Sequence, residues 1–142
     1  MTTRKHLSHQ CPECGAREGL HAFKNATLRV TVKGGLGAEV PGLSGFRCAA
    51  CGEEILDDES TRVFAAAGDA LVLQVRVKIG EHLKRTRQKL GLSQRRAAQL
   101  TGGGHNAFSR YELGKTEPLP AVTNLFRILD RHPELLKELL EA

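Results

Sequence analysis

The chain has 142 residues, a formal net charge of +5, five Phe, one Tyr and no Trp. This length is short for two large domains but sufficient for two small ones, provided that a metal ion or disulfides help to stabilise the smaller. Residues 1–10 are polar and lack the apolar core of a signal peptide, and no run of 18 apolar residues follows. We therefore expect a cytoplasmic protein without a membrane segment.

The positive charge is concentrated in the second half of the chain. Residues 1–74 contain 8 Lys/Arg against 9 Asp/Glu, whereas residues 75–142 contain 13 against 7. Residues 76–115 alone contain ten basic and two acidic side chains. A local excess of this kind attracts a polyanion and accelerates its capture, so nucleic acid is the first partner to consider.

The N-terminal half contains short signals for strands and turns. Apolar and polar residues alternate over residues 28–33, which indicates a β-strand. The glycines between Gly34 and Gly45 indicate turns and loose connections. Residues 1–74 are therefore predicted to form a small, loop-rich sheet domain.

Two Cys-x-x-Cys pairs, Cys11/Cys14 and Cys48/Cys51, are separated by 33 residues, and a glycine follows each pair. Such a turn brings two thiolates together, and the glycine permits the positive φ that the turn requires. Two such turns supply a tetrahedral Cys₄ set that suits one Zn²⁺ ion per chain. A closed Cys₄ site has no open position for substrate, so we expect a structural role and no hydrolytic activity.

Other interpretations of the cysteines exist. They include unligated thiols, two disulfides and an iron site, although paired cysteines in a reducing compartment favour zinc. His6, His9 and His21 lie near the cysteines in sequence and could replace a ligand. A complete thiolate set makes solvated surface histidines the better interpretation.

The acidic residues that begin at Asp57 suit the first turn of a helix, which we expect to reach about residue 67 or beyond. Residues 71–78 are ambiguous between strand and helix. We place the domain boundary near residue 74, with a zinc-binding domain over residues 1–74 and a second domain over residues 75–142.

From Ile79 the apolar pattern is helical. Gly91 ends the first helix, Ser93 is a suitable N-cap for the next over residues 94–100, and three glycines precede a helix over residues 106–113. Two more helices begin at Pro120 and Pro133. The sequence thus predicts an α+β chain: a β-rich zinc domain followed by an all-α, five-helix, lambda-repressor-like helix-turn-helix domain.

In the helix after the glycines, Asn106 and Arg110 share one face, while Phe108 and Tyr111 share another. The aromatic pair is predicted to pack inward. Asn can pair with adenine and Arg with guanine in the major groove, so Asn106 and Arg110 are the candidate base-reading residues. Alternatively, Asn106 only caps the helix, and Arg110 is only a solvated surface residue or forms a surface ion pair with Glu112 or Glu117.

Several nearby polar residues are candidates for contacts with DNA phosphates. Two cations in the first turn of a helix oppose its dipole, so the arginines there need another use, which phosphates would provide. The candidates are Ser93, Gln94, Arg95, Arg96, Ser109 and Lys115.

The segment of residues 102–112, GGGHNAFSRYE, together with Gly114, Pro118 and residues 129–136, LDRHPELL, resembles the MqsA family of antitoxins. The resemblance covers both halves in order, with the cysteines carrying it in the first. It implies an N-terminal Cys₄ zinc domain that binds an mRNA-cleaving toxin, and a C-terminal Xre/Cro-type helix-turn-helix that dimerises and represses its own operon. The family's base-reading Asn and Arg fall on Asn106 and Arg110.

The resemblance implies a homodimer that reads a palindromic operator in double-stranded DNA. Residues 120–142 are the expected dimer surface, although packing within one chain explains their leucines almost as well. A stand-alone transcription regulator with a structural zinc module and no toxin is the alternative function. An enzyme is not expected, because no Ser/His/Asp or Cys/His arrangement is evident and Gly102 to Gly104 lack the Lys-Ser/Thr of a phosphate-binding loop.

Overall fold

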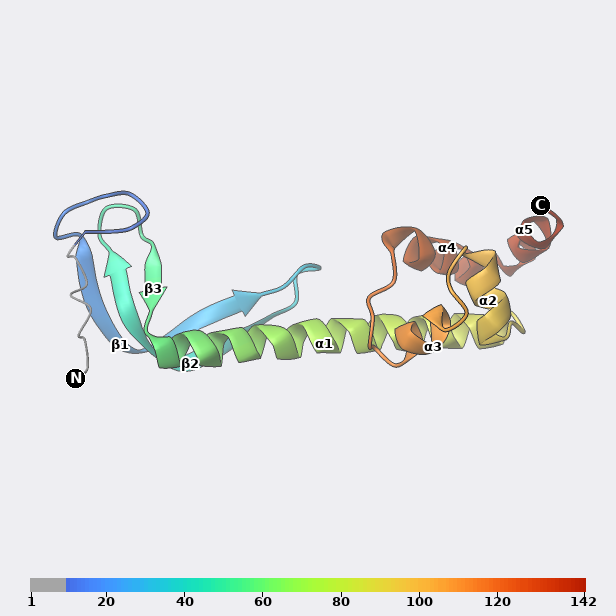
Figure 1. Cartoon of the computed structure of the whole chain (residues 1–142), viewed down its shortest axis with the longest axis horizontal. Helices are drawn as coiled ribbons and strands as arrows, with labels where there is room; N and C mark the ends of the chain where they lie inside the picture. Colours follow the sequence, from blue (N-terminus) through green and yellow to red (C-terminus); the bar gives the residue numbers. More distant parts are fainter. Residues whose placement is uncertain (1–9) are drawn as a thin grey trace. The chain divides into compact units, whose positions relative to one another are not determined.

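A computed structural model describes residues 10–142 and shows an α+β protein (Figure 1). The chain divides into two compact units, Met1–Leu71 and Val72–Ala142, which we call unit 1 and unit 2. Unit 1 contains β1 (Leu20–Thr31), β2 (Gly37–Cys48), β3 (Glu54–Leu56) and the beginning of α1 (Asp58–Lys89). Unit 2 contains the remainder of α1, then α2 (Gln94–Leu100), α3 (Ala107–Glu112), α4 (Pro120–Arg131), the 3₁₀ helix η1 (Pro133–Leu135) and α5 (Leu136–Glu141).

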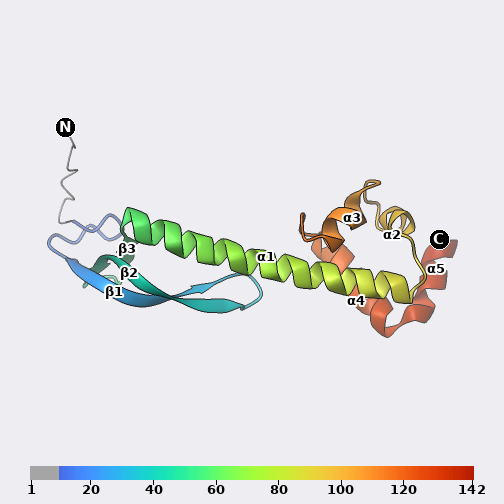
Figure 2. The same cartoon turned by 90° about the horizontal axis from the view of Figure 1, so that it is seen from below.

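The three strands form one antiparallel sheet in the order β1-β2-β3, and β1 and β2 make a long twisted hairpin (Figure 2). The prediction of loose connections across the glycine-rich stretch was wrong, because most of that stretch is strand β2. Gly34 and Gly35 do form the turn, with φ of 97° and 82°. Gly45 has another use: a Cβ there would lie 2.1 Å from the carbonyl oxygen of Ile55, so a glycine lets β3 pair closely with β2.

The core of unit 1 lies between the hairpin and the first turns of α1. Its buried residues are Val30, Val40, Leu43 and Leu71. The beginning of α1 is fixed by Asp57, whose carboxylate accepts from the backbone N–H of Ser60 at 2.7 Å. The Ser60 hydroxyl in turn accepts from the N–H of Ser44 on β2 at 2.8 Å, which ties the helix to the sheet.

The helix α1 is continuous over 32 residues, whereas the sequence predicted one helix to about residue 67 or beyond, an ambiguous segment over residues 71–78 and a helical pattern from Ile79. Gly68 does not interrupt it, because this glycine faces the hairpin and a Cβ there would be 3.5 Å from Val30 Cγ2. The β-branched residues that follow Leu71 would also suit a strand. The packing of Leu71 against the sheet favours a helix instead. Among residues 10–142, no helix is long and apolar enough to cross a membrane.

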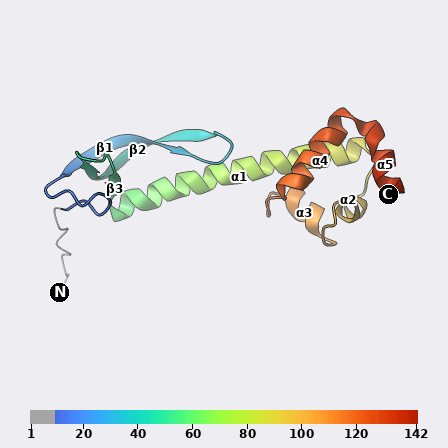
Figure 3. The same cartoon turned by 90° about the horizontal axis from the view of Figure 1, so that it is seen from above.

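In unit 2 the short helices surround the C-terminal part of α1 (Figure 3). The helices α1, α2 and α3 all end in the same way, with a left-handed glycine of φ 68° just beyond the last turn. The amide after each glycine donates to a carbonyl five residues earlier at 2.8 to 3.0 Å. These glycines are Gly91, Gly102 and Gly114.

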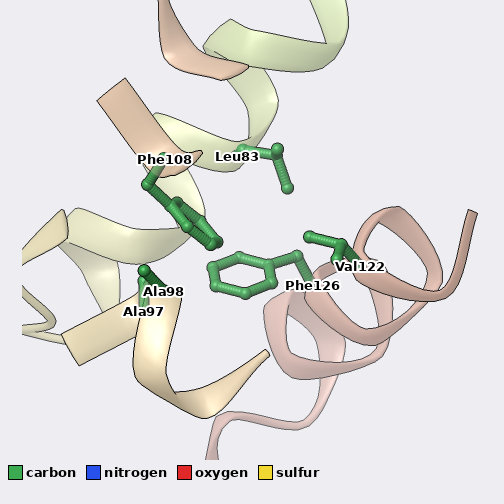
Figure 4. Packing of buried hydrophobic residues seen from close by; sticks show 6 residues of the cluster. All are labelled: Leu83, Ala97, Ala98, Phe108, Val122 and Phe126. Carbon is green, nitrogen blue, oxygen red and sulfur yellow. The ribbon is translucent and has the colours of Figure 1, made fainter. Parts of the chain in front are cut away.

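The core of unit 2 is centred on two aromatic rings, Phe108 of α3 and Phe126 of α4, whose centroids are 5.0 Å apart (Figure 4). Both side chains are completely buried. Tyr111 meets Phe108 edge to face with centroids 5.7 Å apart. The inward orientation predicted for this aromatic pair is therefore confirmed. The remaining buried residues of the cluster are Leu83, Ala97, Ala98 and Val122.

Candidate metal centre and nucleic-acid interface

The two Cys-x-x-Cys turns of unit 1 have the same backbone geometry. In each, the glycine N–H donates to the carbonyl of the first cysteine at 2.9 Å, from Gly15 to Cys11 and from Gly52 to Cys48. The φ angles of these glycines are 74° and 79°. The first turn precedes β1 and the second joins β2 to β3, so the sheet brings them together.

The four Sγ atoms of Cys11, Cys14, Cys48 and Cys51 lie within 4.8 Å of one another. The Sγ atoms of Cys11 and Cys51 are 3.8 Å apart, and those of Cys14 and Cys48 are 3.7 Å apart. Sulfurs at about 2.3 Å from a tetrahedral zinc ion are separated by about 3.8 Å, whereas a disulfide bond is about 2.05 Å long. The geometry therefore fits a metal ion better than disulfides.

The surroundings of the two cysteines of the second turn, Cys48 and Cys51, shift their pKa values in opposite directions. The backbone N–H groups of Cys51 and Ala50 stabilise the thiolate and lower the pKa of Cys48 to about 7. The N–H of Glu53 lowers the pKa of Cys51, but burial and the neighbouring thiols outweigh it and raise that pKa to about 12. A divalent cation among the four sulfurs would remove this competition and favour all four thiolates.

The histidines considered as substitute ligands do not join this cluster. His21 is exposed on β1 and does not belong to the group of four close ligand atoms. His6 and His9 lie outside the described residues. The cysteines alone therefore form the candidate metal site of residues 10–142.

Unit 2 contains two short helices, α2 and α3, joined by the glycine turn. Asn106 precedes α3 and is exposed, and its side chain makes no capping hydrogen bond. Arg110 is exposed on α3 and forms no ion pair with any residue of the described chain. A side-chain cap by Asn106 and an ion pair of Arg110 with Glu112 or Glu117 are therefore absent from residues 10–142, whereas the exposure of Arg110 also fits the solvated surface residue that was the remaining alternative.

A hollow of about 340 Å³ lies beside α3 and is lined by both Asn106 and Arg110. Its lining also includes two polar residues that sequence reasoning missed, His105 and Thr116. His105 is exposed and adjoins Asn106 in the chain, so its position next to a candidate base-reading residue could have indicated it.

The phosphate-contact candidates occupy different environments. Ser93 caps α2, since its hydroxyl accepts from the N–H of Arg96 at 3.1 Å. Arg95, Arg96 and Lys115 are exposed, and Ser109 is half-buried on α3. The Arg96 guanidinium lies 3.4 Å from the side-chain oxygen of Gln99.

Gln94 belongs to a hydrogen-bonded network that joins three helices. The Glu112 carboxylate, at the end of α3, accepts from Arg87 Nε at 2.5 Å and Arg87 Nη2 at 3.1 Å. The same carboxylate accepts from Gln94 Nε2 at 2.9 Å. Burial raises the pKa of Glu112, but the hydrogen bonds from Arg87 and Gln94 outweigh it, so the pKa is lowered. Glu112 therefore pairs with Arg87, 25 residues away, and not with Arg110.

Comparison with known proteins matches residues 9–140 to the family described as the antitoxin component of the bacterial toxin-antitoxin system, MqsA. The chain is 36% identical to the antitoxin MqsA of Escherichia coli (strain K12) over 132 residues, which cover 92% of this chain and 98% of that protein. This chain belongs to the MqsA antitoxin family.

A second similarity is shorter. A 51-residue region is 43% identical to an SPbeta prophage-derived uncharacterized HTH-type transcriptional regulator, YonR, of Bacillus subtilis (strain 168), and covers 35% of this chain and 47% of that protein. The first relative supports a role as an antitoxin, and the second supports a role as a transcription regulator, for this member of the MqsA family. The four-cysteine cluster is its metal-binding site.

Sequence reasoning missed Arg87 and Glu112 in this MqsA-family chain, because no local pattern links residues so far apart. One feature of the sequence nevertheless indicated Glu112. Glu112 is the only acidic residue between His82 and Thr116, in the most basic part of the chain. A single carboxylate in such a segment indicates an internal partner for one of the cations.

Proposed function

We propose that this protein represses its own operon by binding double-stranded DNA through unit 2, and neutralises an mRNA-cleaving toxin through unit 1, in the cytoplasm. In this proposal unit 2 is a five-helix domain of the lambda-repressor type, with α3 as the recognition helix. The observation that carries the proposal is the exposure of Asn106, just before α3, and of Arg110, on α3, whose side chains have no hydrogen-bond or ion-pair partner among residues 10–142. Polar side chains of this kind are available to base edges in the major groove.

The charge around α3 supports DNA as the ligand. Arg95, Arg96 and Lys115 are exposed near the two ends of the helix-turn-helix, where they would neutralise phosphates and release counterions. Asn106 would accept from and donate to an adenine, and Arg110 would donate to a guanine. Phe108 and Phe126 fix the opposite face of α3, so the recognition face does not depend on DNA for its shape.

A homodimer reading a palindromic operator is part of the proposal. Leu139 and Leu140 on α5 are 36% and 40% exposed, and a second copy of the chain would cover such leucines. Two copies would then place two α3 helices about one turn of DNA apart, in successive major grooves.

For unit 1 we propose one structural Zn²⁺ ion held by Cys11, Cys14, Cys48 and Cys51. The sulfur separations of 3.7 and 3.8 Å support it. The ion would hold the two turns together at one end of the hairpin and leave the sheet surface free for the toxin. Mass spectrometry of the native protein tests this assignment through the mass of one zinc ion per chain.

The test of DNA reading is the double substitution Asn106→Ala/Arg110→Ala, assayed on a double-stranded fragment from upstream of the chain's own gene. Specific binding should be lost at physiological salt while the protein stays folded. Arg127→Ala is the matched control, because Arg127 is exposed on α4 and bonds only to Asn124 among the described residues. Unchanged specific affinity in the double variant would refute the assignment of α3.

The similarity to an HTH-type transcriptional regulator favours a second candidate, a stand-alone regulator without a toxin. The two functions differ in one observable. An antitoxin co-purifies with the product of the adjacent gene, and removal of unit 1 releases that product. A stand-alone regulator purifies alone, and it represses its operon equally well with and without unit 1.

A further inference from the structure

Three helices of unit 2 converge on the Glu112 carboxylate. Arg87 comes from the last turn of α1, Gln94 is the first residue of α2, and Glu112 is the last residue of α3. The side chains of Arg87 and Glu112 are only 12% and 5% exposed. Arg87 Nη1 also donates to the carbonyl of Leu92 at 2.8 Å, so the guanidinium joins the end of α1 to the loop before α2.

The Gln94 side chain is the part of this network that reaches the surface. Its Nε2 atom has two N–H groups, of which one donates to Glu112. No other acceptor of the described chain contacts Nε2, and the residue is exposed next to Arg95. The bond to Glu112 thus fixes the amide while one N–H remains available to an external acceptor.

A carboxylate near DNA phosphates normally repels them. Glu112 is compensated by the two-point contact with Arg87, so the pair has no net charge. The lowered pKa of Glu112 keeps the carboxylate ionised and able to accept at neutral pH. The two charges therefore neutralise each other inside the protein. The hydrogen bond from Gln94 to Glu112 fixes the orientation of an amide group at the surface.

We propose that Arg87 and Glu112 are positioning residues for DNA binding: they orient the Gln94 amide so that its second N–H donates to a DNA phosphate. They also hold the end of α3 against the beginning of α2, which fixes the recognition helix relative to that phosphate contact. This inference rests on the proposed DNA-binding function, and it adds a reason for a buried ion pair at this position.

The decisive variant is Arg87→Met/Glu112→Met, which replaces the buried pair by apolar side chains of similar length. Such replacements leave stability unchanged or increased, so unit 2 should fold with a thermal midpoint close to that of the unaltered protein. Affinity for the upstream DNA fragment should nevertheless fall about ten- to a hundredfold, because Gln94 loses its acceptor and the phosphate loses an oriented donor.

Gln94→Met completes the comparison. Alone, it should weaken DNA binding as much as the apolar pair does, and in the Arg87→Met/Glu112→Met background it should cause no further loss. The slope of log affinity against log salt should be the same in all these variants, because no phosphate-neutralising cation is removed. A slope reduced by about one unit would instead indicate that Arg87 itself contacts a phosphate, and would overturn the proposal.

A matched control removes another ion pair of unit 2. Lys89 Nζ lies 3.1 Å from Asp130 Oδ1, and this pair is exposed and forms no side-chain hydrogen bond with α2 or α3 in the described chain. Lys89→Met/Asp130→Met should leave DNA affinity within about twofold of the original. Absence of specific binding by the unaltered protein would refute the proposed function. Specific binding that survives Gln94→Met or the apolar pair would refute the positioning role alone.

Discussion

Two glycines inside α1 provide a paired test of how the recognition helix is held. At Gly80, an added Cβ would lie 2.3 Å from the carbonyl oxygen of Tyr111 and 3.1 Å from that of Glu112. At Gly68, the nearest atom to an added Cβ is Val30 Cγ2, at 3.5 Å. The substitutions Gly80→Ala and Gly68→Ala are chemically identical and occur in the same helix. Their effects on stability should have opposite signs.

The magnitudes follow from two opposing effects. Alanine in a helix interior is about 0.5–1 kcal/mol more favourable than glycine. At Gly68 the new methyl makes an ordinary contact, so Gly68→Ala should stabilise the protein by up to about 1 kcal/mol. At Gly80 the end of α3 must move away by about 1 Å, and overpacking of this kind typically costs about 1–3 kcal/mol. Gly80→Ala should therefore be destabilising by about 1–2 kcal/mol net.

Thermal and urea unfolding measure both effects. The expected change at Gly80 corresponds to a midpoint lowered by roughly 4–8 °C for each kcal/mol in a domain of this size. Tyr111 is the only Tyr and there is no Trp, so intrinsic fluorescence follows unit 2, which contains Gly80, whereas far-ultraviolet circular dichroism also follows unit 1, which contains Gly68. A midpoint that rises in Gly80→Ala as much as in Gly68→Ala would show that α1 and α3 do not approach as described.

Three further outcomes are expected. A strong chelator should unfold unit 1 while the Tyr111 emission of unit 2 stays native, and a metal-free chain that keeps its β-sheet would contradict this. Thr86→Val should stabilise unit 2 by about 1 kcal/mol in urea unfolding, since the buried Thr86 hydroxyl has no partner among the described residues; a loss would show that the hydroxyl is satisfied. Because the folded-state pKa of Glu112 is lowered, its contribution to stability is present above its unfolded pKa of about 4.3 and is lost as the pH falls below it. Acid unfolding of Glu112→Gln should accordingly depend less steeply on pH, and an unchanged slope would exclude this carboxylate as a source of acid sensitivity.

The features that the sequence predicted well are those set by neighbouring residues. The Cys-x-x-Cys-Gly turns need only five consecutive residues, and their cysteines do form one cluster. Gly91 was predicted to end a helix, and it has the left-handed φ that such an end requires. The cap at Ser93 was also predicted from its position before α2, and its hydroxyl accepts from Arg96.

The features that the sequence did not predict depend on contacts distant in the chain. Gly68 weakens a helix locally, yet packing against Val30 compensates, so α1 continues through it. The glycines of β2 locally favour turns, but in the folded chain β3 pairs beside Gly45 and this glycine lies in a strand. Glu112 has a nearby cation in Arg110, but the folded chain gives it Arg87 instead. In each case tertiary packing outweighs a local preference of about 1 kcal/mol.

The turn at the tip of the β1–β2 hairpin is independent of the metal centre that the same hairpin carries (Figure 2). Leu20 pairs with Cys48 at the cysteine end, whereas Thr31 pairs with Gly37 next to the tip. A Cβ at Gly34 or Gly35 would meet nothing within 4 Å. Because doubling the length of a flexible loop costs only about 0.6 kcal/mol, residues inserted between these glycines should be tolerated. The tip is thus a place where evolution, or a protein engineer grafting a peptide, can lengthen the chain without disturbing the four thiolates.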